Sequence, residues 1–427
     1  MELKAWTIFT GIFFLAFCAC SSKATEPKTE VTDGFRVMDT TELEKYNAYL
    51  SYYFDTLLNY RDFSGGILVA KNGTIIYEHY QGDVYGGGEE RISDRTPFHV
   101  ASTSKTFTST AILQLEAQGR LNIEDSVTTY FPDFPYKNIT IRNLLTHSSG
   151  IPNYANFLPQ YKWDRKIDVS NRDVLDVIIQ YKPKLEFTTG ARFKYCNTNY
   201  VILALIVENA SGLSFPAYVK EYIFDVAGMQ DSYVLSTENV GNYMPSWNQS
   251  GRIYNFDYLD GLYGDKNVFT TCRDLMKYDD AIRKNLLLDP LFYQKAWEPN
   301  YRDGGNESWE YYGLGWRLKM FNNNLKIPYH NGWWHGNNSV FQRLILDTAV
   351  IIVTGNRYNS RIYSAARVAN LFRPYYPASA YMQEDHDAFL KRTSSEKTEE
   401  SGDLIEPILL PPASVPAGSG KKVPLPK

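Results

Sequence analysis

The sequence predicts a mixed α/β fold, in which both ends of the chain form one sheet around a mostly helical insertion. Three observations support this prediction. Strand-like segments occur early, in "GGILVAKNGTIIYEHY", and again late, in "YYGLGWRL", "SVFQRLILD" and "AVIIVTGN". Between them, from about residue 110 to 262, apolar residues recur mainly at helical spacing. Each terminal strand region is flanked by a further amphipathic segment, so we expect helices packed on the sheet.

The elements before the insertion follow from local patterns. "TTELEKYNAYLSYYFDTLLNY" has apolar residues at helical intervals, and Thr41 with Glu44 has the spacing of a capping box. Asn72-Gly73 separates two strand-like runs, which predicts a tight hairpin. "HVASTSKTFTST" then opens an apolar helix that should end at Gly119.

The elements after the insertion complete the layer. Asp347-Thr348 is the expected turn between the last two strands, and "RIYSAARVANLF" predicts a closing helix. We therefore expect the folded domain to span residues 38–381. Residues 382–427 change to a polar and then Pro-rich composition that cannot bury enough apolar surface to fold, so we expect a disordered tail.

Composition narrows the classes of function. The chain has 427 residues, of which 44% are hydrophobic, enough for one large domain or two closely packed ones. Its formal net charge is only -4 and it has no long basic run, so we expect no nucleic-acid partner.

The N-terminus has the pattern of an export signal. Residues 1–20 contain a short apolar run behind Lys4 and end in "FCAC", which resembles a bacterial lipoprotein signal in which a cysteine is lipidated. Cys20 is the favoured lipidation site because Ala19 before it is small; Cys18 and an ordinary secretory signal are the alternatives. Residues 21–37 form a polar spacer. We therefore expect a protein of the bacterial cell envelope, anchored to the membrane by lipid and facing the periplasm or cell surface.

Cysteine and histidine patterns suggest neither disulfides nor metal. Only Cys196 and Cys272 remain after the signal, and two cysteines do not make a disulfide framework, so free thiols are expected. The chain has no His-x-x-x-His or paired-cysteine spacing. We expect no metal and no organic cofactor.

Ser102 and Lys105 have the spacing of a nucleophile with its base on one helical face. The same Ser-x-x-Lys spacing recurs at Ser394 and Ser419 in the tail, so the pattern alone is weak. Only Ser102 stands at the start of an apolar helix, where free N–H groups and the positive end of the helix lie close to the hydroxyl. The structural alternative is a capping serine with a solvated lysine.

Two further patterns accompany this pair. Tyr195 and Asn197 occupy a turn before another apolar helix, from which both side chains can enter a cleft. The alternative is a core tyrosine and a helix-capping asparagine. His330, Asn331 and Gly332 precede the strand-like "SVFQRLIL", and a glycine near the start of an edge strand lets a ligand backbone approach closely.

In this order, the motifs resemble those of the serine β-lactamase and penicillin-binding-protein superfamily, specifically its class C-like branch, which also contains D,D-peptidases and esterases. The resemblance covers roughly residues 65–372 and includes "LEAQGRLNIEDSVTTYFP", "ITIRNLLTHSSGIPNY" and "TTCRDLMKYDDAI". It implies the β-lactamase/transpeptidase-like α/β fold: an antiparallel sheet flanked by N- and C-terminal helices, with a mostly helical inserted domain.

The resemblance also implies three catalytic residues. Ser102 matches the acylated nucleophile, Lys105 the amine that helps to remove its proton, and Tyr195 the acid or base that acts on the leaving group and in deacylation. Because a lysine has an ordinary pKa near 10.4, burial or a nearby cation must lower the pKa of Lys105 before it can act as a base at neutral pH. Lys105 and Tyr195 are therefore assigned jointly.

The remaining implied residues bind the substrate or the oxyanion. The substrate-binding positions are Asn197, His330, Asn331 and Gly332, and the oxyanion hole is formed by the backbone N–H groups of Ser102 and Trp333. His330, Asn331 and Gly332 match the third sequence element of the family. This third element is commonly Lys-Thr-Gly in lactamases and His-x-Gly in many peptidase-like and esterase-like relatives. The absence of that lysine and threonine weakens the case for efficient β-lactam hydrolysis. Trp333 and Trp334 add bulk that either suits an apolar acyl group or packs the site.

These observations predict an exported serine hydrolase that forms an acyl-enzyme on Ser102 with a small-molecule or peptide substrate. Peptidase-like action is preferred, followed by ester and then β-lactam hydrolysis. The alternative from another class is a penicillin-binding sensor or binding protein that is acylated without turnover. A purely structural lipoprotein would not be acylated at all. An α/β-hydrolase is disfavoured because the chain has no Gly-x-Ser-x-Gly elbow.

Overall fold

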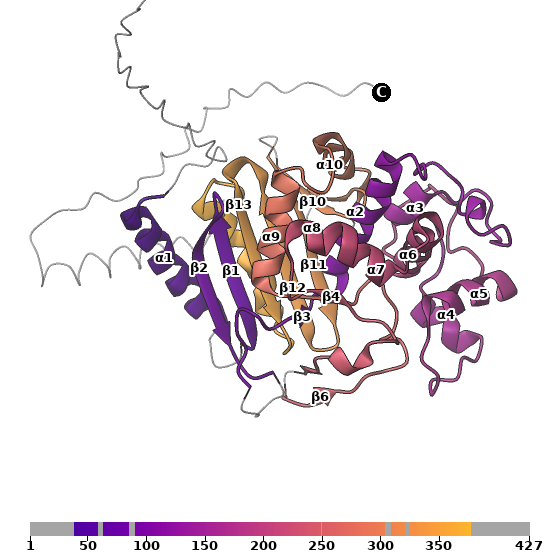
Figure 1. Cartoon of the computed structure of the whole chain (residues 1–427), viewed down its shortest axis with the longest axis horizontal. Coiled ribbons are helices and arrows are strands. Elements are labelled where there is room, and N and C mark those ends of the chain that lie inside the picture. Colours follow the sequence, from indigo (N-terminus) through magenta and orange to yellow (C-terminus); the bar gives the residue numbers. More distant parts are fainter. Residues whose placement is uncertain are drawn as a thin grey trace, which may run out of the picture. The chain divides into compact units, whose positions relative to one another are not determined.

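The computed structural model describes residues 38–58, 63–84, 90–248, 250–303, 309–321 and 325–376. The predicted signal, spacer and C-terminal tail lie outside these residues, as does the predicted end of the domain at 377–381. Figure 1 shows one large sheet with helices packed against both of its faces.

The large sheet has eight antiparallel strands in the order β2-β1-β13-β12-β11-β10-β9-β8. β1 pairs with β13 over its whole length, from Gly65 opposite Gly355 to Lys71 opposite Ala349, so both chain ends build one sheet as predicted. The strands are β1 (Gly65–Lys71), β2 (Thr74–Gln81), β8 (Tyr301–Arg302), β9 (Glu310–Tyr312), β10 (Arg317–Met320), β11 (Lys326–Trp334), β12 (Asn337–Leu344) and β13 (Ala349–Gly355).

The two predicted turns are present. Asn72 and Gly73 both have positive φ, 51° and 73°, which the two central residues of a type I′ hairpin turn require. Thr348 adopts φ 46° between the 3₁₀ turn Ile345–Asp347 and β13. The turn therefore sets the register of β1 against β2 as far as Ala70, and the register shifts between Ala70 and Val69.

Two helices cover one face of the sheet. α1 (Thr40–Leu58) buries Leu50 and Phe54, and the closing helix Ser360–Leu371 buries Ile362, all in one core with β1 and β13. The closing helix is a 3₁₀ helix. The predicted capping box at Thr41 is wrong, because the Asp39 carboxylate caps α1 by accepting the Glu42 N–H at 2.7 Å.

The other face carries the helical part of the chain. α2 packs against α6, and α9 packs against β1 and β13. A small sheet, in the order β3-β7-β4, lies beside them. The helices on this side are α2 (Ser104–Ala117), α3 (Ile141–Leu145), α4 (Tyr154–Gln160), α5 (Asn171–Tyr181), α6 (Thr198–Ser211), α7 (Phe215–Val219), the π-helix Lys220–Phe224, α8 (Asp225–Ala227), α9 (Cys272–Arg283) and α10 (Pro290–Ala296).

The short strands complete this region: β3 (Phe98–His99), β4 (Tyr233–Val234), β7 (Val268–Thr270), and the separate pair β5 (Ser246–Trp247) and β6 (Ile253–Tyr254). Within the described ranges no single helix is long and apolar enough to cross a bilayer. The consecutive helices Thr198–Ser211 and Phe215–Ala227 meet the length and hydropathy requirement only together, with a bend of 77°.

The helix that carries the serine-lysine pair begins later than predicted. Ser102 lies in a 3₁₀ turn, Ala101–Thr103, and α2 begins at Ser104. Ala101 adopts φ 47°, a left-handed conformation that residues other than glycine rarely take, so this turn is conformationally strained. Gly119, with φ 68°, follows the end of α2 as predicted.

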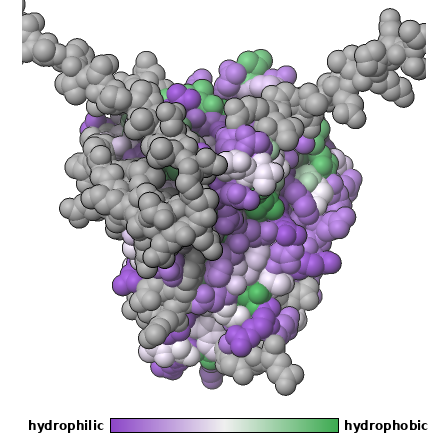
Figure 2. Space-filling model, turned by 90° about the vertical axis from the view of Figure 1, so that its left-hand side faces the viewer, coloured by the Kyte–Doolittle hydropathy of each residue, from purple (hydrophilic) through white to green (hydrophobic). Residues whose placement is uncertain are grey.

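The thiols and the visible surface agree with a globular domain. Cys196 and Cys272 are free and buried, which confirms the expectation of free thiols. Where the described surface can be seen in Figure 2, it is mainly hydrophilic, with apolar residues in small separate groups. This side therefore presents no broad apolar patch among the residues coloured.

A buried carboxylate joins α9 to the sheet. Asp279 accepts from Arg343 Nε on β12 at 2.5 Å and from Arg283 Nε at 2.5 Å. Burial acts to raise the pKa of Asp279, but the two guanidinium groups hold it below its ordinary value. Such a carboxylate stabilises the fold above the pKa of the unfolded chain, and this contribution is lost as the pH falls through the folded-state pKa.

We predict that Asp279→Asn lowers the free energy of unfolding by about 3–5 kcal/mol at neutral pH, because it leaves two buried cations without their anion. Urea denaturation followed by circular dichroism measures the change. Asp280→Asn is the matched control, since Asp280 forms a more exposed pair with Lys284 and should cost less than about 1 kcal/mol. Equal losses in the two variants would contradict the prediction.

Candidate active site

The Lys105 amine lies beside the Ser102 hydroxyl. Lys105 Nζ is 3.1 Å from Ser102 Oγ and donates at 2.7 Å to the backbone carbonyl of Asp265. The lysine side chain is buried on α2, whereas Ser102 remains half-exposed on the preceding turn. The Ser102 hydroxyl is therefore accessible while the neighbouring amine is shielded from water, which disfavours the alternative of a solvated lysine.

Burial changes the protonation of Lys105. It lowers the pKa of this amine to about 7, the Asp265 carboxylate opposes the shift, and the Arg317 guanidinium adds to it. Without burial, a lysine with a pKa near 10.4 would be almost entirely protonated at pH 7. In this environment a large fraction is neutral and can accept the Ser102 proton.

Tyr195 packs against the same amine. Its ring centroid is 5.0 Å from Lys105 Nζ, and its hydroxyl is buried near the Ser102 hydroxyl. Burial raises the pKa of Tyr195 above its ordinary value, although Arg317 and the Ser102 hydroxyl both act to lower it. Tyr195 is therefore a neutral phenol, suited to donate a proton, whereas Lys105 is the stronger candidate for the base.

Asn197 occupies the N-cap position of α6 but makes no side-chain cap hydrogen bond. Its side-chain oxygen is buried and unpaired among the described residues. A buried polar atom without a partner requires an explanation, and contact with a substrate is the one that the sequence predicted. The structure thus disfavours the alternative of a helix-capping asparagine.

β11 brings the third element to this site and leaves one of its edges open. The pairing of β10 with β11 stops at Arg317 opposite Tyr329, whereas β12 pairs with β11 as far as Trp334. From His330 onward, β11 therefore has a strand on one side only in the described structure. β11 is an interior strand and Gly332 lies near its end, so the predicted position at the start of an edge strand is wrong. His330, Asn331 and Gly332 nevertheless lie where one edge of β11 has no neighbouring strand.

His330 is buried and neutral. Its Nδ1 lies 2.8 Å from the Asn331 carbonyl, which can only accept, so Nδ1 carries the proton and Nε2 accepts from the Tyr312 hydroxyl at 3.1 Å. Burial, together with the charges of Arg317 and Lys105, keeps the pKa of His330 well below its ordinary value. The histidine therefore does not replace the cation of a lysine at this position.

Gly332 allows the nucleophile turn to contact β11. A Cβ at this position would lie 2.1 Å from the Val100 carbonyl oxygen, so only glycine fits. The Thr103 hydroxyl, next to the nucleophile, lies 2.9 Å from Ser339 Oγ on β12 and 3.3 Å from the His330 carbonyl. These contacts join the turn and the strand that carry the two predicted oxyanion donors, the N–H groups of Ser102 and Trp333.

The side chains of β11 alternate between the two faces of the sheet. Asn331 is half-buried, and its side chain lies on the opposite face of the sheet from that of His330. Its predicted role in binding therefore stays a prediction. Trp333 is 64% exposed and lies next to Tyr358, with ring centroids 5.9 Å apart. Trp334 shares the alternation of Gly332 and packs on Lys266. Trp334 therefore packs the site, whereas Trp333 faces away from Gly332.

Arg317 was not predicted from the sequence. Its guanidinium lies on β10, 5.3 Å from the centroid of the Tyr195 ring, and is paired with Asp303. It acts to lower the pKa of Lys105, Tyr195 and His330. The site therefore keeps a fixed cation, supplied by the neighbouring strand instead of by the His-Asn-Gly element. Its sequence signal was weak, an arginine inside the strand-like "YYGLGWRL".

His147 was also missed, although it occurs in the quoted segment "THSSG". Its ring is buried, with its centroid 4.3 Å from that of the Tyr195 ring, and its Nδ1 accepts a hydrogen bond from the Cys196 N–H at 3.1 Å. Burial and the nearby Lys105 hold the pKa of His147 well below its ordinary value. A neutral His147 thus fastens the turn that carries Tyr195 and Asn197.

One group of side chains in the described structure has atoms close enough to hold a metal: Asp257, Asp260 and His335. The Asp260 carboxylate already accepts from Trp334 Nε1 at 2.6 Å and lies 3.1 Å from His335 Nε2. Hydrogen bonds therefore account for this arrangement, and the buried Lys266 nearby acts against a second cation.

Comparison with known proteins identifies the family. Residues 53–371 match the family model described as beta-lactamase. Penicillin-binding protein 4* of Bacillus subtilis is 31% identical over 353 residues, which cover 77% of this chain and 76% of that protein. The chain belongs to the beta-lactamase family.

Solved structures support the fold of this beta-lactamase family member. A penicillin-binding protein from Bacillus halodurans is similar with a TM-score of 0.65 and 25% identity, covering 75% of this chain and all of that one. A class C beta-lactamase is similar with a TM-score of 0.63 and 18% identity, covering 78% and 97%. The predicted β-lactamase/transpeptidase-like fold is thereby confirmed, and the relatives are of the general serine-hydrolase and penicillin-binding-protein kind.

We predict that the acylation of Ser102 accelerates as the pH rises and reaches half of its plateau rate near pH 7, because Lys105 accepts a proton only when neutral and burial places its pKa at about 7. Stopped-flow acylation with an activated ester between pH 5 and 9 measures this. Lys105→Arg keeps a permanent charge and should lose roughly 10²–10⁴-fold in rate. An unchanged rate in this variant would exclude Lys105 as the base.

Asn197 and Asn199 offer a matched test of function against stability. Asn197→Ala should change the free energy of unfolding by less than about 0.5 kcal/mol and lower kcat/KM roughly two- to tenfold through the loss of a substrate hydrogen bond. Asn199 Oδ1 accepts from Ser149 Oγ at 2.7 Å in the core, so Asn199→Ala should cost about 1–3 kcal/mol of stability. Urea denaturation and steady-state kinetics separate the two, and the reverse pattern would make Asn197 structural.

Proposed function

We propose that the protein is an exported serine hydrolase that forms a covalent acyl-enzyme on Ser102. This proposal rests on one contact: Lys105 Nζ lies 3.1 Å from Ser102 Oγ, and the lysine side chain is buried. It supplies a nucleophile with an adjacent neutral amine, which is the requirement for activating a serine hydroxyl.

In the proposed acylation step, Lys105 removes the Ser102 proton as Oγ bonds to the substrate carbonyl carbon. The negative charge that develops on the carbonyl oxygen is stabilised by the backbone N–H groups of Ser102 and Trp333. Tyr195, which remains protonated, donates its proton to the leaving group as the bond to that group breaks. Lys105 returns a proton to the phenol, and water then releases the acyl group through the same groups in reverse.

We infer peptidase-like substrates first, followed by esters and then β-lactams. The relative from Bacillus subtilis that covers most of this chain is a penicillin-binding protein. The neutral His330 and Asn331, where lactamases carry lysine and threonine, weaken the grip on a β-lactam carboxylate. Arg317 offers a fixed cation nearby, but Asp303 already neutralises much of its charge.

We further propose that the protein works in the bacterial cell envelope, with Cys20 as its lipid anchor. The apolar run and the "FCAC" ending of residues 1–20 support this localisation. Two measurements would test the anchor. Processing of the protein in cells should be sensitive to globomycin, and the Cys20→Ser variant should be released into the soluble fraction.

The decisive measurement is time-resolved intact mass of the protein mixed separately with a serine-reactive fluorophosphonate, an activated ester and a penicillin. We predict a covalent adduct that maps to Ser102 and is absent from Ser102→Ala. Because Ser104 is also a serine of this segment but is buried and accepts from the Val268 N–H, Ser104→Ala is the matched control and should still be labelled.

The fate of the adduct separates the candidate functions. Decay of the ester or penicillin adduct within seconds to minutes indicates a hydrolase. An adduct that forms quickly and persists indicates a penicillin-binding sensor. Equal labelling of the native protein and Ser102→Ala, or no labelling of either, would remove the basis for an acyl-enzyme.

A further inference from the structure

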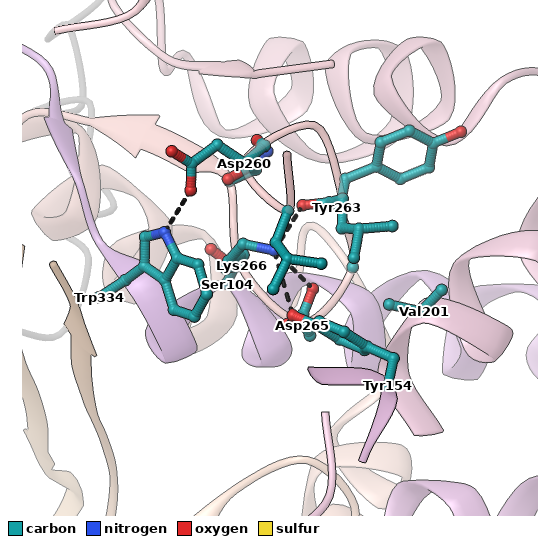
Figure 3. A network of polar contacts seen from close by, with 12 residues as sticks. Ser104, Tyr154, Val201, Asp260, Tyr263, Asp265, Lys266 and Trp334 are labelled. Atoms are coloured by element: carbon teal, nitrogen blue, oxygen red, sulfur yellow. Dashed lines mark hydrogen bonds and ion pairs between the residues drawn. The ribbon is translucent and has the colours of Figure 1, made fainter. Parts of the chain in front are cut away.

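A buried charged network lies directly behind the catalytic amine. Lys266 and Asp265 are next to each other in the chain, their side chains are almost completely buried, and Lys266 Nζ is 3.8 Å from Asp265 Oδ1. The Tyr154 hydroxyl donates to Asp265 Oδ2 at 2.8 Å and accepts from Lys266 Nζ at 3.2 Å. Figure 3 shows Asp265, Lys266 and Tyr154 converging on one another. Neither charge has a part in the proposed acyl transfer.

The network extends to the end of β11. Lys266 Nζ lies 4.8 Å from the centroid of the Trp334 ring, and Trp334 Nε1 donates to Asp260 Oδ1 at 2.6 Å. Figure 3 shows Trp334 and Asp260 on the opposite side of Lys266 from Asp265. Two buried carboxylates therefore flank one buried ammonium, an arrangement that costs desolvation energy and is not needed to fill a core.

The backbone beside Lys105 is fixed to α2. The Gly264 carbonyl accepts from Thr108 Oγ1 at 2.7 Å, and the Val268 N–H donates to Ser104 Oγ at 3.0 Å. Gly264 itself has φ 93° and packs so closely on α6 that a Cβ would lie 2.4 Å from the Tyr200 carbonyl oxygen. The Asp265 carbonyl between these anchors is thus held at the position where it accepts from Lys105.

We propose that Asp265 and Lys266 are positioning residues for Lys105: the Asp265 carbonyl orients the amine toward Ser102, and the two side-chain charges set, with opposite signs, the pH at which that amine accepts a proton. This inference rests on the proposed function. The proton leaves Ser102 Oγ and binds Lys105 Nζ, so a nearby carboxylate favours the protonated amine and a nearby ammonium favours the neutral one.

The electrostatic directions agree with this geometry. The Asp265 carboxylate acts to raise the pKa of Lys105 against the lowering by burial. Burial lowers the pKa of Lys266, the carboxylates of Asp265 and Asp260 oppose this, and the charge of Lys105 lowers it further. Coulomb repulsion is mutual, so a charged Lys266 must also lower the pKa of Lys105.

The other titratable groups that face Lys105 come from the turn after α3, the turn before α6, α6 itself, β10 and β11. They are His147, Tyr195, Cys196, Tyr200, Arg317 and His330. Burial keeps the two histidines, the two tyrosines and the thiol in their neutral forms near pH 7. Asp265 and Arg317 are therefore the charged groups that act on Lys105, and the action of Lys266 is inferred from its charge beside Asp265.

The test is an NMR titration of Lys105 in the full chain labelled with ¹³C at lysine Cε, with the resonance assigned by its loss in Lys105→Arg. We expect Asp265→Asn to lower the midpoint by about one pH unit, and Lys266→Met to raise it by about one unit. Asp274→Asn is the matched control, because Asp274 is equally buried but binds Ser232 and Lys277 elsewhere; its midpoint should equal that of the native protein.

A kinetic measurement accompanies the titration. The pH at which acylation by p-nitrophenyl acetate reaches half of its plateau should move down in Asp265→Asn and up in Lys266→Met. Tyr154→Phe keeps both charges and should leave this pH unchanged even where stability falls. The direction of the pH shift is predicted separately for each variant. If one variant fails to fold, the shift in the other still tests the proposal.

Shifts of the same sign, or native midpoints in both variants, would overturn the proposal and make the pair purely structural. This failure is distinct from that of the proposed function. The titration reports on Lys105 whether or not Ser102 reacts, and labelling of Ser102 by a fluorophosphonate reports on the nucleophile whether or not the titration midpoints move.

Discussion

The site depends on the burial of one amine next to one hydroxyl. In the proposed mechanism Lys105 acts as a base only because the protein removes its ammonium group from water while leaving Ser102 accessible. This requires a carbonyl to accept from the amine, which Asp265 provides, and a closely packed wall around it, which α6 and β11 provide. The strained turn at Ala101 and the absence of a side chain at Gly332 contribute to the same arrangement, because they let the turn that carries Ser102 pack against β11.

Charge around this amine is distributed in an unexpected way. The third element contributes a neutral histidine, and the fixed cation comes from Arg317 on the adjacent strand. A cation on β10 acts on Tyr195 and Lys105 together, whereas one on β11 would point directly at the ligand. In the proposed mechanism Arg317 therefore acts on the acid and the base of the site, and its ion pair with Asp303 would limit how strongly it attracts an anionic substrate.

The sequence predicted those features that depend on local spacing. Ser102 and Lys105 meet because residues three apart share a helical face, and Asn72-Gly73 forms its turn because both residues tolerate positive φ. Arg317 and Asp265 were missed because their roles depend on strand pairing and on a loop packed against α2, which no local pattern encodes. The cap of α1 was misplaced because Asp39 and Thr41 are both good capping residues, and only the observed hydrogen bond distinguishes them.

The pairing of β1 with β13 has a consequence for how the protein folds. Gly65 and Gly355 lie opposite each other, although almost the whole domain separates them in sequence. Strands so distant in sequence must close a very long loop before they gain any contact energy, so the sheet forms slowly and late. β11 and the end of β13 follow the helical insertion, and a ribosome-bound chain cannot assemble the site until they emerge. The turn that carries Ser102 is therefore synthesised well before the strands that complete its surroundings.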